Sequence, residues 1–131
     1  MADGFKILAA KEMVSDATGL ATVDGSFVYR VPRPSGQRHA TRDRSQAIIS
    51  SIVICHHGGN QNPTVTLRVV RDGFSTPVVF DDSQYVIYKN SITTNQTKVY
   101  SLGIGLTADN AIYASSTLAD VNIHIFGTEF A

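Results

Sequence analysis

The chain has 131 residues, of which 43% are hydrophobic and 17% are charged, and its formal net charge is zero. This length corresponds to one domain with a sizeable core, and the single cysteine excludes a framework of internal disulfides. Zero net charge gives no global basic field of the kind that attracts nucleic acid, and no apolar run reaches the ~20 residues that a membrane-spanning helix needs.

Residues with branched β-carbons dominate the composition. Val, Ile and Thr together number 36, whereas Leu numbers only 6. Branched side chains are stiff at χ1 and fit a pleated sheet better than a helix. The composition therefore predicts an all-β domain.

Residues 1–23 form the least decided segment. Its apolar stretch, residues 7–14, fits either a short helix or an irregular strand, so we expect an N-terminal arm or a leading strand before the main domain at 24–131. The apolar run at residues 5–10 is too short for the hydrophobic region of a secretory signal, which predicts a chain that is not secreted.

The remaining apolar segments alternate with turns at intervals of about ten residues, a spacing typical of antiparallel sandwiches and barrels. They predict about eight or nine strands in a single antiparallel β-sandwich, jelly-roll-like, although immunoglobulin-like strand order gives the same spacing. Residues 47–55 are the most apolar and predict a central strand covered on both faces. Residues 103–110 predict a glycine-punctuated corner. The other predicted strands are 26–31, 64–70, 77–80, 84–89, 97–102, 111–115 and 121–126.

A polar, basic segment at residues 37–45 interrupts this pattern and predicts a loop. Four of the seven arginines of the chain lie between positions 33 and 44. Arginine is frequent where proteins recognise anionic surfaces or partner proteins, but a simple solvated loop explains the segment equally well. Nucleic acid is the least favoured partner, since no aromatic residues alternate with the arginines. The candidate partner-binding residues are Arg33, Arg38, His39, Arg42 and Arg44.

Few residues point to chemistry. Potential metal ligands occur without the spacing of a zinc site, which favours a buried thiol and turn histidines, and a pair of aspartates lacks the alternating oxygen ligands of a calcium loop. No G-x-S-x-G elbow occurs, and one Gly-x-Gly pair lacks the third glycine of a dinucleotide site. We therefore expect no catalytic residues, no cofactor and no metal. The residues weighed were Cys55, His56, His57, His124, Asp81, Asp82, Gly103 and Gly105.

Several stretches of the sequence resemble one family. They are Val31-Pro32, then SSIVICHHG at 50–58, TVTLRVVR at 64–71, LGIGLTADN at 102–110 and VNIHIFGTE at 121–129. Together they resemble small β-sandwich virion proteins of tailed bacteriophages, including marine and cyanobacterial phages. The chain departs from that pattern where the basic segment follows Pro32 and where His56-His57 replaces the commoner polar pair.

The resemblance implies a non-enzymatic virion structural protein, assembled in the host cytoplasm. A capsid decoration (cement) protein that clamps neighbouring capsid subunits is the first hypothesis. Its partners would be the major capsid protein or other virion proteins, and further copies of itself in a homo-oligomer such as a trimer. A neck, tail or baseplate component is the alternative within that class. The alternative outside it is a carbohydrate-binding or receptor-binding module, with Tyr85, Tyr88, Tyr100 and Tyr113 as candidate contacts; an enzyme ranks third.

Overall fold

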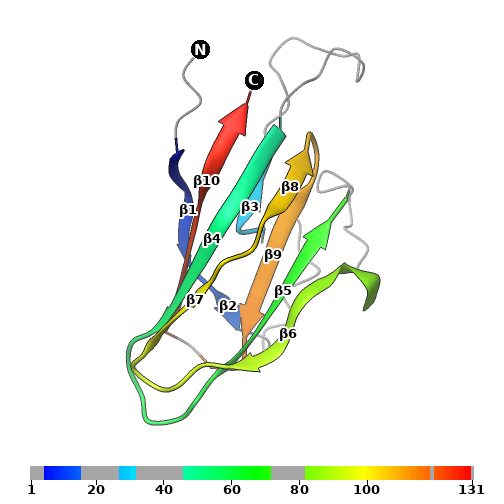
Figure 1. Ribbon diagram of the computed structural model, residues 1–131. Helices are drawn as coiled ribbons and strands as arrows, with labels where there is room; N and C mark the ends of the chain where they lie inside the picture. The colour runs from blue at the N-terminus through cyan, green and yellow to red at the C-terminus, as the bar shows by residue number, and fades with distance from the viewer. Residues whose placement is uncertain (1–4, 16–26, 32–45, 72–81, 119, 131) are drawn as a thin grey trace.

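The structure is a computed structural model that describes residues 5–15, 27–31, 46–71, 82–118 and 120–130 (Figure 1). Within these ranges the chain forms strands, turns and one 3-10 turn, η3 (Asp82–Gln84), and no helix is long and apolar enough to cross a membrane. The strands are β1 (Phe5–Glu12), β2 (Val14–Ser15), β3 (Tyr29–Arg30), β4 (Gln46–His56), β5 (Thr64–Val70), β6 (Tyr85–Ser91), β7 (Thr97–Tyr100), β8 (Ile104–Thr107), β9 (Ala111–Ser116) and β10 (Val121–Phe130).

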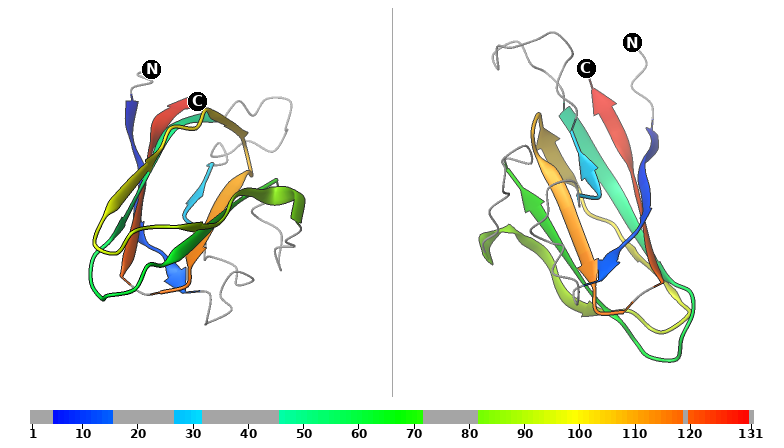
Figure 2. Two further views of the ribbon diagram at one scale, coloured as in Figure 1. Left: turned by 60° about the horizontal axis from the view of Figure 1, so that its bottom comes forward. Right: turned by 180° about the vertical axis from the view of Figure 1, so that it is seen from behind.

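These strands form two sheets that pack face to face, which Figure 2 shows from two further sides. Sheet A has the order β1-β10-β4, and β7 and β8 pair with successive halves of β4 at its far edge. Sheet B has the order β9-β5-β6, and both β2 and β3 pair with β9. The prediction of an all-β sandwich is confirmed. In the described part of the chain, eight strands have four or more residues, and the two-residue strands β2 and β3 bring the total there to ten.

The strand order is that of a jelly roll. In this topology a long antiparallel ribbon folds over, so that the first strand pairs with the last and each inner strand pairs with its counterpart. Here β1 pairs with β10, β3 with β9, β4 with β7 and β8, and β5 with β6, all antiparallel. The sheets are completed by the antiparallel pairs β10–β4 and β9–β5. Turn spacing alone does not distinguish this order from an immunoglobulin-like one, but the pairing does.

The core lies between the two sheets and consists mainly of branched aliphatic side chains. In β10 every second residue from Val121 to Gly127 is buried, and β4 shows the same alternation on either side of the pair Ser50-Ser51, as expected for strands that cover the core with one face. Sheet B contributes β9, whose six residues are all buried, and much of β5. The largest fully buried apolar side chains are Ile49, Ile52, Ile54, Leu67, Ile92, Ile112, Ile123 and Ile125.

Two irregularities in sheet A lie on either side of β10. The register shifts between Ile7 and Ala9 on β1, and between Phe126 and Gly127 on β10. Gly127 is required there, because a Cβ atom at this position would lie 2.1 Å from the carbonyl oxygen of Ile48. Bulges of this kind bend a strand and increase its twist.

Three predictions of local structure need correction. The strand predicted at 47–55 is central in sheet A, but only one of its faces is covered, and Ile48 is 48% exposed. The predicted corner at 103–110 contains strand β8, because this segment pairs with the first half of β4. The strand predicted at 26–31 has only two strand residues within the described part, because only Tyr29 and Arg30 pair with β9.

The N-terminal segment contributes a strand to sheet A. Residues 5–12 are strand β1, the leading-strand alternative, and β1 pairs with β10 along most of its length. The strand predicted at 77–80 lies outside the described residues.

Candidate functional site

The predicted partner-binding residues all lie outside the described residues. Arg33, Arg38, His39, Arg42 and Arg44 belong to the segment 32–45. The described residues give its two ends. Val31, after β3, is buried and its backbone N–H donates to the carbonyl of Asn110 over 3.0 Å, and Gln46 opens β4 in sheet A.

The potential metal ligands are not brought together by the fold. Cys55 is half-buried and lies on the outward side of β4, whereas the next residue, His56, points into the sandwich. His57 is exposed beyond the end of β4, and His124 pairs with Val53. Among the residues that the structure describes, no group of three or more His, Cys, Asp or Glu side chains could hold a metal ion.

The candidate tyrosines are also dispersed. Tyr113 is buried, and Tyr100 donates a hydrogen bond to the side-chain oxygen of Asn90 over 2.5 Å. Tyr85 and Tyr88 meet on β6 with ring centroids 4.6 Å apart, but their planes are inclined by 65°. A sugar ring stacks on a flat open aromatic face, which this edge-to-face pair does not provide.

The most distinctive surface is the side of sheet A that faces away from sheet B, here called the outer face. Paired residues of antiparallel strands point to the same side of a sheet, so the register identifies its members. The row across the middle runs Ala10, His124, Val53 and Val99, on β1, β10, β4 and β7. The described members of the outer face are Ile7, Ala10, Glu12, Gln46, Ile48, Ser51, Val53, Cys55, Thr97, Val99, Gly105, Thr107, Asn122, His124, Phe126, Thr128 and Phe130.

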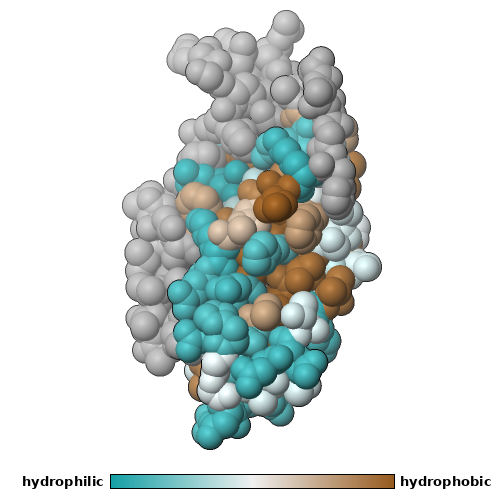
Figure 3. All heavy atoms as spheres, turned by 90° about the vertical axis from the view of Figure 1, so that its left-hand side faces the viewer, coloured by the Kyte–Doolittle hydropathy of each residue, from teal (hydrophilic) through white to brown (hydrophobic). Residues whose placement is uncertain are grey.

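Apolar groups are prominent on this face. Ile7 is 57% exposed, Val99 59% and Ile48 48%. Figure 3 looks at this side of the molecule and shows apolar residues gathered near its middle, with polar residues around and between them. The rings of His124 and Phe126 stack nearly parallel, with centroids 6.4 Å apart. Exposed apolar residues scattered singly need no explanation, but a contiguous group indicates an interaction surface.

The outer face carries almost no charge. Glu12, at one corner, is the only Asp, Glu, Lys or Arg among its described members. The basic residues of β1 and β7 lie on the other side of the sheet, the side that faces sheet B. Lys11 donates to the carbonyl of Phe27 over 2.9 Å, and Lys98 donates to the side-chain oxygen of Asn90 over 2.6 Å. Charge is thus directed to the rims of the sandwich and away from the outer face.

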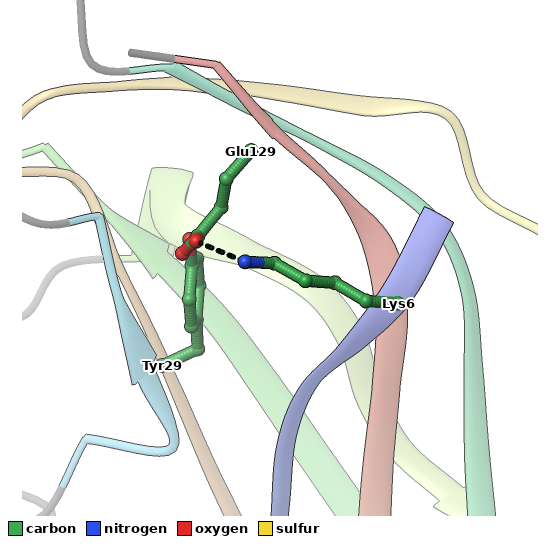
Figure 4. Close-up of polar contacts among 3 residues, drawn as sticks. All are labelled: Lys6, Tyr29 and Glu129. Carbon is green, nitrogen blue, oxygen red and sulfur yellow. Dashed lines mark hydrogen bonds and ion pairs between the residues drawn. The ribbon is translucent and has the colours of Figure 1, made fainter. Parts of the chain in front are cut away.

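A polar cluster at one rim joins the two sheets. Glu129 on β10 accepts a hydrogen bond from the Tyr29 hydroxyl on β3 and forms an ion pair of 3.0 Å with Lys6 on β1 (Figure 4). Burial, the hydrogen bond and the nearby carboxylate together raise the pKa of Tyr29 far above its usual value. Burial raises the pKa of Glu129, but the hydrogen bonds from Tyr29 and Lys6 and the Lys6 charge outweigh it and hold that pKa below its ordinary value. Each group in the cluster has a partner, which indicates a structural role.

A small hollow of about 200 Å³ lies where β4 ends. His56, only 2% exposed, forms part of its wall. Its Nδ1 accepts a hydrogen bond from the backbone N–H of Asn95 over 3.2 Å and lies 3.2 Å from the hydroxyl of Thr94, so the neutral ring carries its proton on Nε2. The lining residues are His56, Gly58, Gly59, Asn60, Gln61, Leu118 and Asp120.

Sequence reasoning did not identify the outer face. The signal was present in the continuous apolar run of β4, which was interpreted as a strand covered on both faces. In the monomer the outward residues of that run, Ile48 and Val53, have no covering layer from sheet B. The hollow at His56 was also missed, since its lining combines segments about 60 residues apart in sequence.

Comparisons with protein-family models, with curated proteins and with solved structures gave no significant match. The resemblance to phage virion proteins therefore remains a hypothesis, and the chain is described by its own geometry: a jelly roll with a nearly uncharged, partly apolar outer face.

Proposed function

We propose that the chain is a non-enzymatic structural protein of a tailed-phage virion that works by binding neighbouring subunits, as a capsid decoration (cement) protein. The observation that carries this proposal is the outer face of sheet A. It spans the strands of one sheet, leaves Ile7, Ile48 and Val99 about half exposed, and has one charged residue among its described members. Such a surface suits a permanent contact, because interface cores are depleted in charge.

The fold and the resemblance add support of a weaker kind. Jelly rolls form many viral capsid domains, but they also form lectin domains and cupins, so topology alone does not select a function. The stretches that carry the resemblance fall largely on β4, β5, β8 and β10. These strands build the sandwich and the outer face, as expected if the shared property is a scaffold for assembly.

The arginine-rich segment is a second proposed contact. The segment 32–45 connects the end of β3, in sheet B, with the start of β4, in sheet A. It contains Arg33, Arg38, His39, Arg42 and Arg44. Guanidinium groups bind carboxylates in a two-pronged geometry, which suits an acidic patch on a capsid subunit. Replacing Arg38, Arg42 and Arg44 together with Ser should weaken assembly and leave the melting temperature nearly unchanged. If the triple variant assembles like the unaltered protein, the segment is only a solvated connection.

The proposal is tested by quantitative mass spectrometry of particles purified from the source of the chain. Hundreds of copies per particle would support a decoration protein of the head. A few to a few tens of copies would assign the chain to the neck, tail or baseplate. Absence from the particle would overturn the virion proposal.

A carbohydrate-binding module is the second candidate, and the hollow beside His56 favours it. A sugar hydroxyl both donates and accepts hydrogen bonds. The hollow is lined by the imidazole of His56, the side-chain amides of Asn60 and Gln61 and the carboxylate of Asp120, with the apolar side chain of Leu118 beside them. A glycan array decides this candidate: specific binding that is lost in Asp120→Asn but retained in Glu12→Gln would support it, and no binding would reject it.

A further inference from the structure

We propose that the outer face of sheet A packs against the outer face of a second copy of this chain, giving a two-fold symmetric dimer in which the two A sheets are stacked. This inference deepens the proposed assembly function by naming the partner of its main surface. Two sheets that pack face to face are held about 10 Å apart by interdigitating side chains. The dimer would therefore be four sheets thick, with sheet A in an inner layer.

The sequence of β4 does not match the surroundings of this strand in the monomer. A run as apolar as Ala47–Ile54 is typical of a strand that is buried on both faces. In the monomer the inward residues Ile49, Ile52 and Ile54 are fully buried, whereas the outward Ile48 is 48% exposed. A second sheet on the outer face would complete the surroundings that this sequence fits.

The exposed apolar groups of the outer face lie on neighbouring strands. Ile7 on β1 pairs with Phe126 on β10, and Val99 on β7 pairs with Val53 on β4. Register also joins Val53 to His124 on β10. The apolar groups thus cross the whole sheet in adjacent rows, so a partner sheet would contact them together.

The scarcity of charge on the outer face favours a second copy over a charged partner. An acidic or basic protein would gain little from a face whose described members include one charged residue, Glu12. Self-association brings no clusters of like charge together. Glu12 lies at a corner of the face, so a two-fold axis that crosses the middle of the face along the strands, or at right angles to them, leaves the two copies of Glu12 at different corners. The zero net charge of the whole chain adds no repulsion between copies.

The area of the outer face is large enough for a stable dimer. Four strand widths of about 4.8 Å and a length of ten residues at about 3.3 Å each give a face of roughly 600 Å². Two such faces bury roughly 1,200 Å², which reaches the lower bound for specific, stable interfaces.

The test is the molecular mass of the full chain in solution, measured by sedimentation equilibrium over a range of concentrations. We expect a monomer–dimer equilibrium for the unaltered protein. Ile48→Lys and Val99→Lys place a charge in the stacked layer and should each raise the dissociation constant of the dimer about tenfold or more. Val86→Lys is the matched control, since Val86 is a similarly exposed valine on sheet B, and it should leave the dimer intact.

The single cysteine provides an independent readout. Cys55 is half-buried on the outer face, where it pairs with Asn122 and Thr97. A thiol reagent should modify it more slowly as the protein concentration rises and the dimer forms. In Ile48→Lys the rate should stay at the monomer value at all concentrations. A rate that is independent of concentration in the unaltered protein would contradict stacking through this face.

Three outcomes would overturn the inference. The first is a monomer at all concentrations up to about 100 μM, which is ~100 times a dissociation constant of about 1 μM. The second is a trimer, and the third is a dimer that Val86→Lys disrupts and Ile48→Lys does not. The proposed function fails separately. If the chain is abundant in virions but monomeric in solution, the dimer proposal is contradicted and the virion proposal is supported. A dimer that is absent from virions would do the reverse.

Discussion

The hydroxyl of Tyr29 donates a hydrogen bond to the carboxylate of Glu129, and this contact joins residues that are 100 positions apart in the chain. Tyr29 lies on β3 in sheet B and Glu129 on β10 in sheet A, so the bond ties the two sheets together at one rim. Lys6 on β1 completes the cluster through its ion pair with the same carboxylate. The three residues (Figure 4) therefore connect both layers and the first and last long strands.

Tyr29→Phe tests this connection. The ring stays buried, but the hydrogen bond to a charged acceptor is lost, which should lower the free energy of unfolding by about 1.5–3 kcal/mol. Tyr88→Phe is the control: Tyr88 is 57% exposed, and the change should stay within about 0.5 kcal/mol. Chemical denaturation of both variants provides the measurement. Equal stability of the two would show that the Tyr29–Glu129 bond contributes nothing net.

The same cluster predicts how stability depends on pH. Because the pKa of Glu129 is held below its usual value in the folded state, the unfolded chain takes up the proton first as the pH falls. The stabilisation is therefore present above the unfolded pKa of about 4.3 and is lost as the pH falls from there through the folded pKa. The difference in unfolding free energy between the unaltered protein and Glu129→Gln should be constant from pH 8 to pH 6 and shrink below about pH 4. A difference that grows in acid would reverse the assigned sign.

Gly127→Ala tests the close approach of β10 and β4. The added Cβ would lie 2.1 Å from a backbone oxygen, that of Ile48, so the two strands must separate to make room. We expect a loss of about 1–3 kcal/mol or more, as for other overpacked cores. Gly103→Ala is the control: Gly103 lies between β7 and β8, where an added Cβ also meets nothing within 4 Å. If both variants unfold at the same denaturant concentration, the approach is not as tight as described.

Local pattern was sufficient to predict most of the architecture. Alternation located β5 and β10 closely, because one face of each of these segments is apolar and period two is a local property. The prediction failed where pairing partners decide the outcome. Residues 104–107 contain two polar or glycine positions, and they form β8 only because β4 extends far enough to pair with them. Strand order likewise depends on which strands meet, which local pattern does not encode.

The candidate sites depended even more on long-range arrangement. The outer face is assembled from β1, β10, β4 and β7, and its lack of charge is visible only when their register is known. Lys6, Lys11 and Lys98 occur on these strands, and the sequence does not show that they project toward sheet B. The arginines at 33–44, by contrast, are a local concentration that the sequence displays directly, and their contacts stay a prediction.

Ile52 and Ile48 provide the final prediction, since they lie on one strand and face opposite sides. Ile52 is fully buried, so Ile52→Ala should cost about 2–5 kcal/mol at any protein concentration. Ile48→Ala, on the outer face, should cost little below the dissociation constant of the dimer and progressively more above it, because binding stabilises only the folded state. Thermal unfolding of both variants at several concentrations separates the two effects. A concentration-independent cost at Ile48 would mean that its side chain is covered within the monomer, and a negligible cost at Ile52 would mean that β4 is placed in the wrong register.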